Sequence, residues 1–329
     1  MSVVLGSGEH TYRAHEGQWG DLPQGWDLVD VAGVAVDDRD RVFVYNRGPR
    51  PMIVLDRDGR LLGSWGEDFV TRAHGIHRGP DGNLYLTDEG DHTVRKVTPE
   101  GEVLLEIGTA GRPAARWSGE PFHRCTHTAT SPDGDIYVSD GYGNARVHKF
   151  APDGSYLFSW GRSGVGDGEF SLPHNIACDA EGWVYVADRE NHRVQVFDGA
   201  GRYETQWNRV HRPSALHLAG FHTTAGPEPL CYVGEIGTPL DFQRGAPGLG
   251  PRIGIYTPNG ELRARLGTEP TPGTRAGQFV SPHGICVDSR GDIYVGEVAH
   301  TGWPNVFGPD VPRPRPLRAL QKLVRTAAV

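Results

Sequence analysis

A short motif recurs six times along this chain of 329 residues, and it constrains the fold more than any other feature. Each copy has a turn, then a short apolar run, then an acidic or amide residue that ends the run. The motif stands at 81–88, 133–140, 181–188 and 290–297, and in weaker form at 41–46 and 231–235. Short apolar runs bounded by Gly, Asp and Pro are typical of β-strands joined by tight turns. The sequence therefore predicts a repeated β unit.

Each copy continues with two more apolar runs, as in 147–150 and 156–161, and the last of them commonly ends in Trp-Gly. Four strands at a period of roughly 40 to 50 residues are typical of a propeller blade. We therefore predict an all-β fold, a six-bladed β-propeller that residues 1–329 form as a single domain. The segment 12–20 also ends in Trp-Gly, so we expect this N-terminal strand to close blade six beside a third strand at 317–325. Such closure removes open sheet edges.

The repeat puts three histidines in register. At the same spacing before the end of the motif, copies two, four and six carry His74, His174 and His283, whereas copies one and three carry Ala32 and Thr126. In copy five the matching residue is Ser214, because 213–215 resembles 173–175, although about seven extra residues separate it from the end of the motif. The repeat itself therefore does not require histidine there. Because alternate blades of six lie a third of a turn apart, the three imidazoles are expected to converge on the axis.

Three neutral imidazoles with an open fourth position are the ligands of many catalytic zinc sites. A histidine at the start of a strand can instead simply hydrogen-bond a neighbouring carbonyl, and a motif alone does not decide between the two. The threefold placement favours a metal. We predict that His74, His174 and His283 bind Zn²⁺ or another divalent transition metal.

The starts of first strands and the ends of second strands share one face of a propeller. Arg47, Tyr142 and Arg189 follow second strands, so they are expected around the same mouth as the histidines. Forked guanidinium groups suit a carboxylate. His127 follows Thr126 and is a candidate for a supporting or proton-transfer role, with an idle loop histidine as the alternative.

Composition narrows the partners. The formal net charge is −8 without a block of like charges, which argues against nucleic acid. No run reaches the length of a membrane span, and the N-terminus lacks the basic start and apolar core of a signal peptide. The four cysteines form no CxxC pair and fit reduced thiols. We expect a small-molecule substrate, no nucleic acid, no membrane and a cytoplasmic location. The oligomeric state is not indicated.

The chain resembles the NHL-repeat propellers, and among them the peptidyl-alpha-hydroxyglycine lyases that complete peptide amidation. The resemblance extends over essentially every blade. The segments that carry it surround the histidines (73–75, 172–174 and 281–283), Tyr142 (138–146), Arg189 (186–191) and Arg47 (44–48).

The resemblance implies Zn²⁺ on the three histidines, with Tyr142 as the base and Arg47 and Arg189 orienting the substrate. The reaction of that family collapses a carbinolamide: the hydroxyl is deprotonated, the C–N bond breaks, and an aldehyde acid and an amide leave.

Two residues depart from the pattern of the family. Gly284 stands where the lyases have an aspartate after the last metal histidine, and His127 stands where they have an aspartate in blade three. The first change puts the structural Ca²⁺ of the family in doubt, and together they suggest a different substrate. We expect a zinc-dependent, lyase-like enzyme that cleaves or forms a carbinolamide or other carbonyl adduct of a small carboxylated or hydroxylated compound.

Two other functions stay open. One is a lactonase-type hydrolase, although such propellers generally place acidic and amide Ca²⁺ ligands on the axis. The other is a non-catalytic NHL scaffold that binds a protein or RNA. Two insertions in blade five, at 217–230 and 236–252, are candidates for a lid or for passive surface loops.

Overall fold

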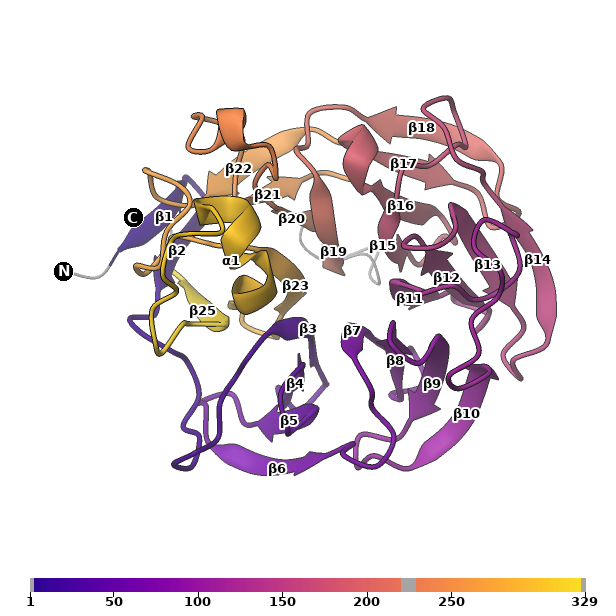
Figure 1. Ribbon diagram of the computed structural model, residues 1–329, viewed down its shortest axis with the longest axis horizontal. Helices are drawn as coiled ribbons and strands as arrows, with labels where there is room; N and C mark the ends of the chain where they lie inside the picture. The colour runs from indigo at the N-terminus through magenta and orange to yellow at the C-terminus, as the bar shows by residue number, and fades with distance from the viewer. Residues whose placement is uncertain (1–2, 220–228, 327–329) are drawn as a thin grey trace.

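Six antiparallel sheets stand around a central axis in the computed structural model, which describes residues 3–219 and 229–326 (Figure 1). This mainly-β six-bladed propeller confirms the predicted fold class. The innermost strands of blades one to six are β3 (Val31–Val36), β7 (Ala73–Arg78), β11 (His127–Thr130), β15 (Pro173–Cys178), β19 (Pro213–Ala219) and β23 (Pro282–Val287).

The second and third strands of each blade follow outward from the axis. The second strands are β4 (Val42–Asn46), β8 (Leu84–Asp88), β12 (Ile136–Asp140), β16 (Val184–Asp188), β20 (Leu230–Glu235) and β24 (Ile293–Glu297). The third strands are β5 (Met52–Leu55), β9 (Thr93–Val97), β13 (Arg146–Phe150), β17 (Arg193–Phe197), β21 (Arg252–Tyr256) and β25 (Leu320–Arg325). The outer strands of blades one to five are β6 (Leu61–Trp65), β10 (Val103–Gly108), β14 (Tyr156–Trp160), β18 (Tyr203–Trp207) and β22 (Leu262–Leu266).

The N-terminus closes the ring, as the sequence predicts. Strand β2 (His10–Ala14) pairs with β25, and Tyr12 lies opposite Arg325. Two details differ from the expectation. Strand β2 ends at Ala14, so Trp19 lies beyond it and packs edge-on against Tyr294, with ring centroids 4.9 Å apart. A further strand, β1 (Val4–Ser7), pairs with β2 and gives this blade five strands.

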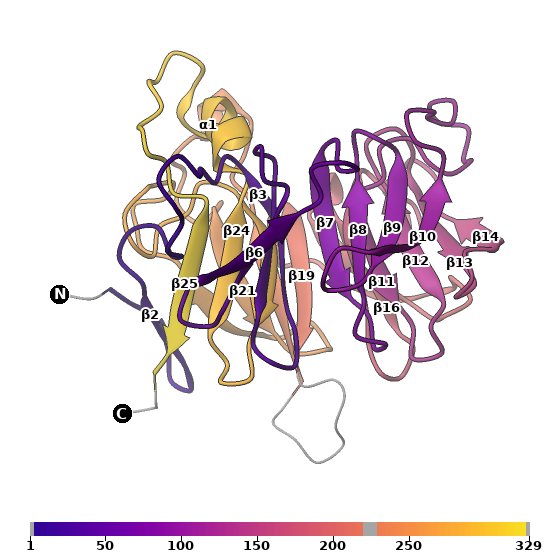
Figure 2. The same cartoon turned by 90° about the horizontal axis from the view of Figure 1, so that it is seen from below.

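A helix between β24 and β25 was not predicted. Helix α1 (Ala299–Phe307) buries Trp303 and Val306. It covers part of the face of the propeller at which the innermost strands begin, at the top of Figure 2. Its first turn has no side-chain cap of its own. Instead, Oδ1 of Asp30 accepts the backbone N–H groups of His300 and Thr301, at 2.8 and 3.2 Å. This carboxylate satisfies donors that every helix start leaves open, and it ties the helix to blade one.

The core consists of apolar side chains that fill the spaces between neighbouring blades. Both faces of an inner sheet are covered, so second strands such as β16 are buried along their whole length, whereas the outer strand β10 is mostly exposed. Burying a Val, Ile or Phe side chain stabilises the fold by roughly 1.5–3 kcal/mol each. The six sheets are therefore held together mainly by packing between blades.

The insertion at 236–252 in blade five follows β20, contains the short 3-10 helix η2 (Asp241–Gln243) and reaches α1. Nε of Arg244 donates to the backbone carbonyl of Asn305 at 3.2 Å. The other insertion includes residues 220–228, which lie outside the described residues. None of the helices in the described part of the chain has the length and hydropathy needed to cross a membrane.

Candidate metal centre

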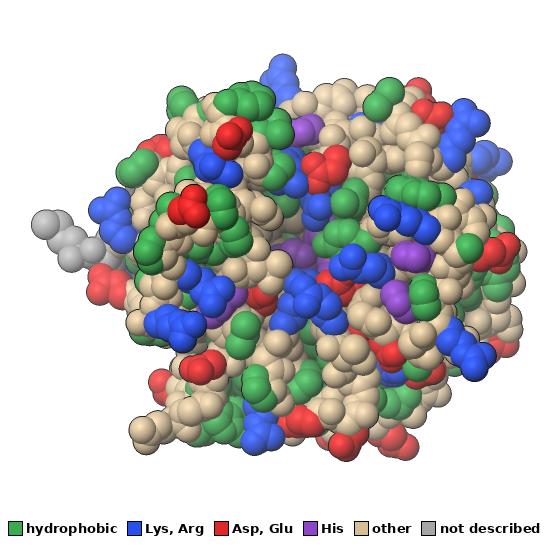
Figure 3. Space-filling model, viewed as in Figure 1, with side chains coloured by type: hydrophobic (Ala, Val, Ile, Leu, Met, Phe, Trp, Pro, Cys, Tyr) green, Lys and Arg blue, Asp and Glu red, His purple; other side chains and the backbone are tan. Residues whose placement is uncertain are grey.

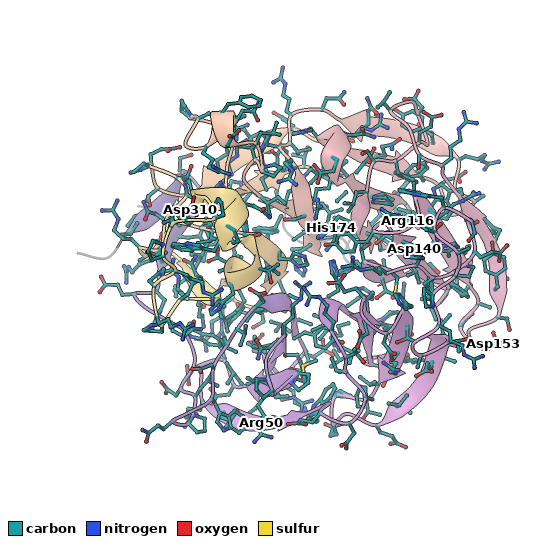
Figure 4. All side chains as sticks on the ribbon, in the orientation of Figure 1. Arg50, Arg116, Asp140, Asp153, His174 and Asp310 are labelled. Carbon is teal, nitrogen blue, oxygen red and sulfur yellow. The ribbon has the colours of Figure 1, made fainter. Side chains whose placement is uncertain are left out.

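His74, His174 and His283 meet on the axis, as their register predicts. Each is the second residue of its innermost strand, and all three are buried. Their ring centroids are 4.6 to 4.9 Å apart, and the candidate ligand atoms lie within 4.8 Å of one another. Figure 4 labels His174 at the inner edge of the ring of blades.

Each imidazole is held by the blade that follows it. The Nδ1 atoms of His74, His174 and His283 lie 2.5, 2.7 and 2.7 Å from backbone carbonyl oxygens. These carbonyls belong to Thr126, Ser214 and Ala32, the residues at the same position of the alternate blades. Because a carbonyl can only accept, Nδ1 carries the proton and Nε2 keeps its lone pair. The hydrogen bond from Nδ1 to the carbonyl therefore leaves Nε2 available as a metal ligand.

The surroundings keep these imidazoles neutral. Burial lowers the pKa of all three well below the usual range, and the positive charge of Arg47 lowers the pKa of His74 further. Arg189 does the same to His174. Since metals bind the neutral ring, the three histidines are in the form that a metal ligand needs.

Tyr142 lies directly against the group of three histidines. Its hydroxyl is 3.1 Å from Nε2 of His74 and 3.2 Å from Nε2 of His174. The glycines on either side make this approach possible, because a Cβ at Gly141 would overlap a backbone carbonyl of blade four and a Cβ at Gly143 would overlap His123. The loop after β12 therefore places the phenol beside the convergent nitrogens.

Arg47 reaches the same mouth and bonds the carbonyl that a hydroxyl bonds in two other blades. In blades three and five the side chains of Thr126 and Ser214 donate to the carbonyl before the next histidine, at 2.8 and 2.6 Å. Ala32 cannot do so. The corresponding carbonyl, of Ala73, instead accepts Nε of Arg47 at 2.8 Å.

A buried carboxylate, Glu89, gathers three guanidinium groups. It is bonded to Arg47 at 3.2 Å, to Arg72 at 2.7 Å and to Arg124 at 2.5 Å. Burial by itself would raise the pKa of Glu89, but the three arginines outweigh it and hold the pKa below the usual value. Glu89 is therefore ionised and fixes the direction of Arg47.

Glu190 plays the same part for Arg189. Nε of Arg189 bonds Glu190 at 2.7 Å, and the same carboxylate bonds Arg212 at 2.7 Å. Although burial opposes it, these two arginines lower the pKa of Glu190 to about 2. The guanidinium carbons of Arg124 and Arg189 lie 4.9 and 5.8 Å from the centroid of the Tyr142 ring, within the range of cation–π attraction.

Sequence reasoning missed Glu89, Arg124, Glu190 and Arg212. A signal was present for two of them, because Glu89 and Glu190 stand one and two residues after second strands, and Arg47 and Arg189 each stand one residue after such a strand. With them the mouth holds more arginines than glutamates. Figure 3 shows the resulting gathering of Lys and Arg side chains around the hollow at the middle of this face, with histidine between them.

The structure does not bring His127 to this group. Along the propeller axis, His127 lies beyond the three histidines, on the side away from Tyr142. It lines a cavity that opens on the opposite face of the propeller. Its Nδ1 donates to the carbonyl of Thr128 at 2.8 Å, and burial lowers its pKa to about 4. Gly284 is packed tightly, since a Cβ there would be 2.6 Å from Cα of Gly33. The backbone as it stands has no room for an aspartate at that position.

The fold and the site together define a six-bladed propeller that carries a three-histidine centre on its axis. The NHL repeat matches residues 170–197 and 279–301, which include His174 and His283. The protein is an NHL-repeat propeller related to peptidyl-alpha-hydroxyglycine alpha-amidating lyase and to NHL repeat-containing protein 3, at about 30% identity.

Two curated relatives give the extent of this relationship. NHL repeat-containing protein 3 of Homo sapiens is 33% identical over 188 residues, which cover 53% of this chain and 54% of that protein. Peptidyl-alpha-hydroxyglycine alpha-amidating lyase 1 of Drosophila melanogaster is 29% identical over 283 residues, which cover 80% of this chain and 50% of that protein. The chain thus spans about half the length of these relatives.

Solved structures of low identity share the fold. A streptogramin B lyase structure superposes with a TM-score of 0.60 at 14% identity, covering 97% of this chain and 100% of the other. A gluconolactonase from Xanthomonas campestris superposes with a TM-score of 0.59 at 11% identity, covering 97% and 91%. At these identities the likeness concerns the propeller fold alone.

Proposed function

We propose that this protein is a zinc-dependent lyase that cleaves or forms a carbinolamide, or a related carbonyl adduct, of a small carboxylated or hydroxylated compound. The observation that carries the proposal is the position of the Tyr142 hydroxyl, 3.1 and 3.2 Å from two Nε2 atoms of a buried trio of histidines. The relationship to the amidating lyases supports the same reaction class.

The donor set fits a divalent transition metal. The candidate ligands are three neutral imidazoles, and His74, His174 and His283 each point Nε2 toward the axis because a carbonyl holds Nδ1. Nitrogen ligands suit zinc and its neighbours, whereas Ca²⁺ prefers oxygen. A bound metal would supply Lewis acidity toward an oxygen of the substrate.

The arginines are suited to hold an acidic group. Arg47 precedes Tyr142 in the sequence and Arg189 follows it. Each arginine is anchored by a glutamate, which is buried for Arg47 and half-buried for Arg189. Anchoring restricts the side chains before binding, so less conformational entropy is lost when a carboxylate arrives. Their forked donors can then orient the substrate.

The proposed chemistry uses Tyr142 to move one proton. In one concerted relay, its oxygen accepts the proton of the carbinol hydroxyl while the phenol gives its own proton to the departing nitrogen. The O–H electron pair of the carbinol forms the new C=O bond, and the C–N bond breaks toward nitrogen. The products are an aldehyde and an amide, so atoms and charge balance without a further reactant. Proton transfer by a positioned side chain contributes typically 10²–10⁴-fold to such a rate.

The first test is elemental analysis of protein purified without chelator or immobilised-metal resin, comparing wild type with His174→Ala. The proposal predicts about one zinc or similar metal per chain in wild type and its loss in the variant. A second assay follows the cleavage of a small α-hydroxyglycine amide by wild type and Tyr142→Phe. Wild-type protein that neither contains metal nor takes up added Zn²⁺ would contradict the proposal and favour a non-catalytic scaffold.

A further inference from the structure

The cavity that His127 lines lies on the axis, on the opposite side of the three histidines from Tyr142. Its volume is about 770 Å³, and it is lined by residues of all six innermost strands and by the turns that follow them. It therefore opens on the face away from α1, the lower face in Figure 2. Small-molecule sites typically measure roughly 300–1,000 Å³, so the cavity is large enough for an organic ligand.

The inner end of this cavity carries two polar side chains, Asn175 and His127. Asn175 is only 3% exposed, and its carboxamide makes no hydrogen bond to any described residue; its Oδ1 is buried without a partner. His127 donates Nδ1 to the carbonyl of Thr128, and backbone groups of Ile76 and Ile176 also contact its ring. Buried amides without partners are rare and destabilising. A molecule that pairs with the Asn175 carboxamide, once the carboxamide turns toward the cavity, would remove this penalty.

The middle of the cavity is an apolar belt. Each belt residue lies two positions after the residue that stands at the histidine level of its strand: Val34, Ile76, Ile176, Leu216 and Ile285. The mouth is different, because it carries five carboxylates. Four of them are bonded to Arg41, Arg57 and Arg78; the five are Asp37, Asp38, Asp40, Asp179 and Asp288. An apolar body suits the belt, and the five carboxylates outnumber the three arginines bonded to them, which disfavours an anion.

We propose that this cavity binds a small neutral molecule with an apolar body and a carboxamide head. A carboxamide donates and accepts, as the side chain of Asn175 does, so the two groups are complementary. No charged side chain of the described lining lies at the inner end. A charged head would lose its hydration there without compensation.

The test uses three probes that share one ring: benzamide, benzoate and benzylammonium. Ligand-detected NMR titrations on the metal-loaded protein should show that benzamide binds at least about tenfold more weakly to Asn175→Leu than to wild type, because the leucine cannot pair with the head group. Arg189→Met, on the opposite face, should leave benzamide binding unchanged but weaken any binding of benzoate. This site does not depend on the proposed lyase activity.

A second variant reverses the preference. Asn175→Asp places a carboxylate at the inner end with almost no change in shape, so benzylammonium should bind it better than benzamide does. Metal content is measured in each variant because Asn175 follows His174. The proposal is overturned if benzamide does not bind wild type, if it binds Asn175→Leu equally well, or if its binding depends on Arg189. If Asn175→Leu does not fold, Asn175→Asp decides: the proposal is overturned if benzylammonium binds this variant no better than benzamide does.

Discussion

The buried carboxylate of Glu89 makes a sharp prediction about stability. The side chains of Glu89 and Arg47 are only 2% and 8% exposed and lie 3.2 Å apart. The side chains of the other two partners of Glu89, Arg72 and Arg124, are 44% and 46% exposed. Removing one partner of a buried ion pair costs roughly 3–5 kcal/mol, while an exposed pair is worth about 0–1 kcal/mol. Because glutamine keeps part of the hydrogen bonding, we expect Glu89→Gln to lower the free energy of unfolding by about 2–4 kcal/mol at pH 7.

The pH dependence provides the assay. The folded pKa of Glu89 is below its ordinary value of 4.5, so the stabilisation is complete above that value and is lost as pH falls through the folded pKa. Urea denaturation of wild type and Glu89→Gln should therefore show a gap at pH 7 that narrows below about pH 4.5. Glu100→Gln is the matched control, because Glu100 bonds Arg41 but is 72% exposed. Equal effects of the two substitutions, or a gap that does not change with pH, would refute the reasoning.

Three further outcomes are expected. Tyr142→Phe removes only the hydroxyl that contacts His74 and His174, so this variant should retain the metal and lose turnover of a carbinolamide. Normal turnover would exclude the phenol from the mechanism. Thr126→Val keeps the backbone carbonyl that holds an imidazole, so elemental analysis should find its metal retained, whereas His174→Ala should lose it. Gly284→Asp puts a Cβ 2.6 Å from Cα of Gly33, an overpacking that should cost about 1–3 kcal/mol; an unchanged thermal midpoint would show that the backbone yields freely.

The glutamates also explain why the two arginines differ from ordinary surface arginines. A free guanidinium in solution samples many rotamers, but Arg47 and Arg189 are each tied to a carboxylate that is itself tied to a second arginine. The networks hold the donors in place and still leave an excess of positive charge at the mouth. Both properties favour an acidic ligand on this face rather than on the carboxylate-rich face opposite.

The repeat alone determined the propeller, its closure by the N-terminus, and the meeting of His74, His174 and His283. The physical reason is symmetry: residues at one register position of equivalent blades lie at one height and one radius, so convergence follows from spacing without knowledge of any contact. The ends of second strands share that face, which is why Arg47 and Tyr142 were also found from the sequence.

Only the tertiary structure decided how the histidines are held and where His127 lies. The carbonyls that bind Nδ1 belong to the next blade, and the arginines that Glu89 gathers come from separate loops. Such contacts depend on packing between blades and on loop paths, which no period in the sequence encodes. His127 is one residue past the level of the three histidines, and a strand rises about 3.3 Å per residue. Its side chain lies in the cavity on the side of the opposite face, which the repeat did not predict.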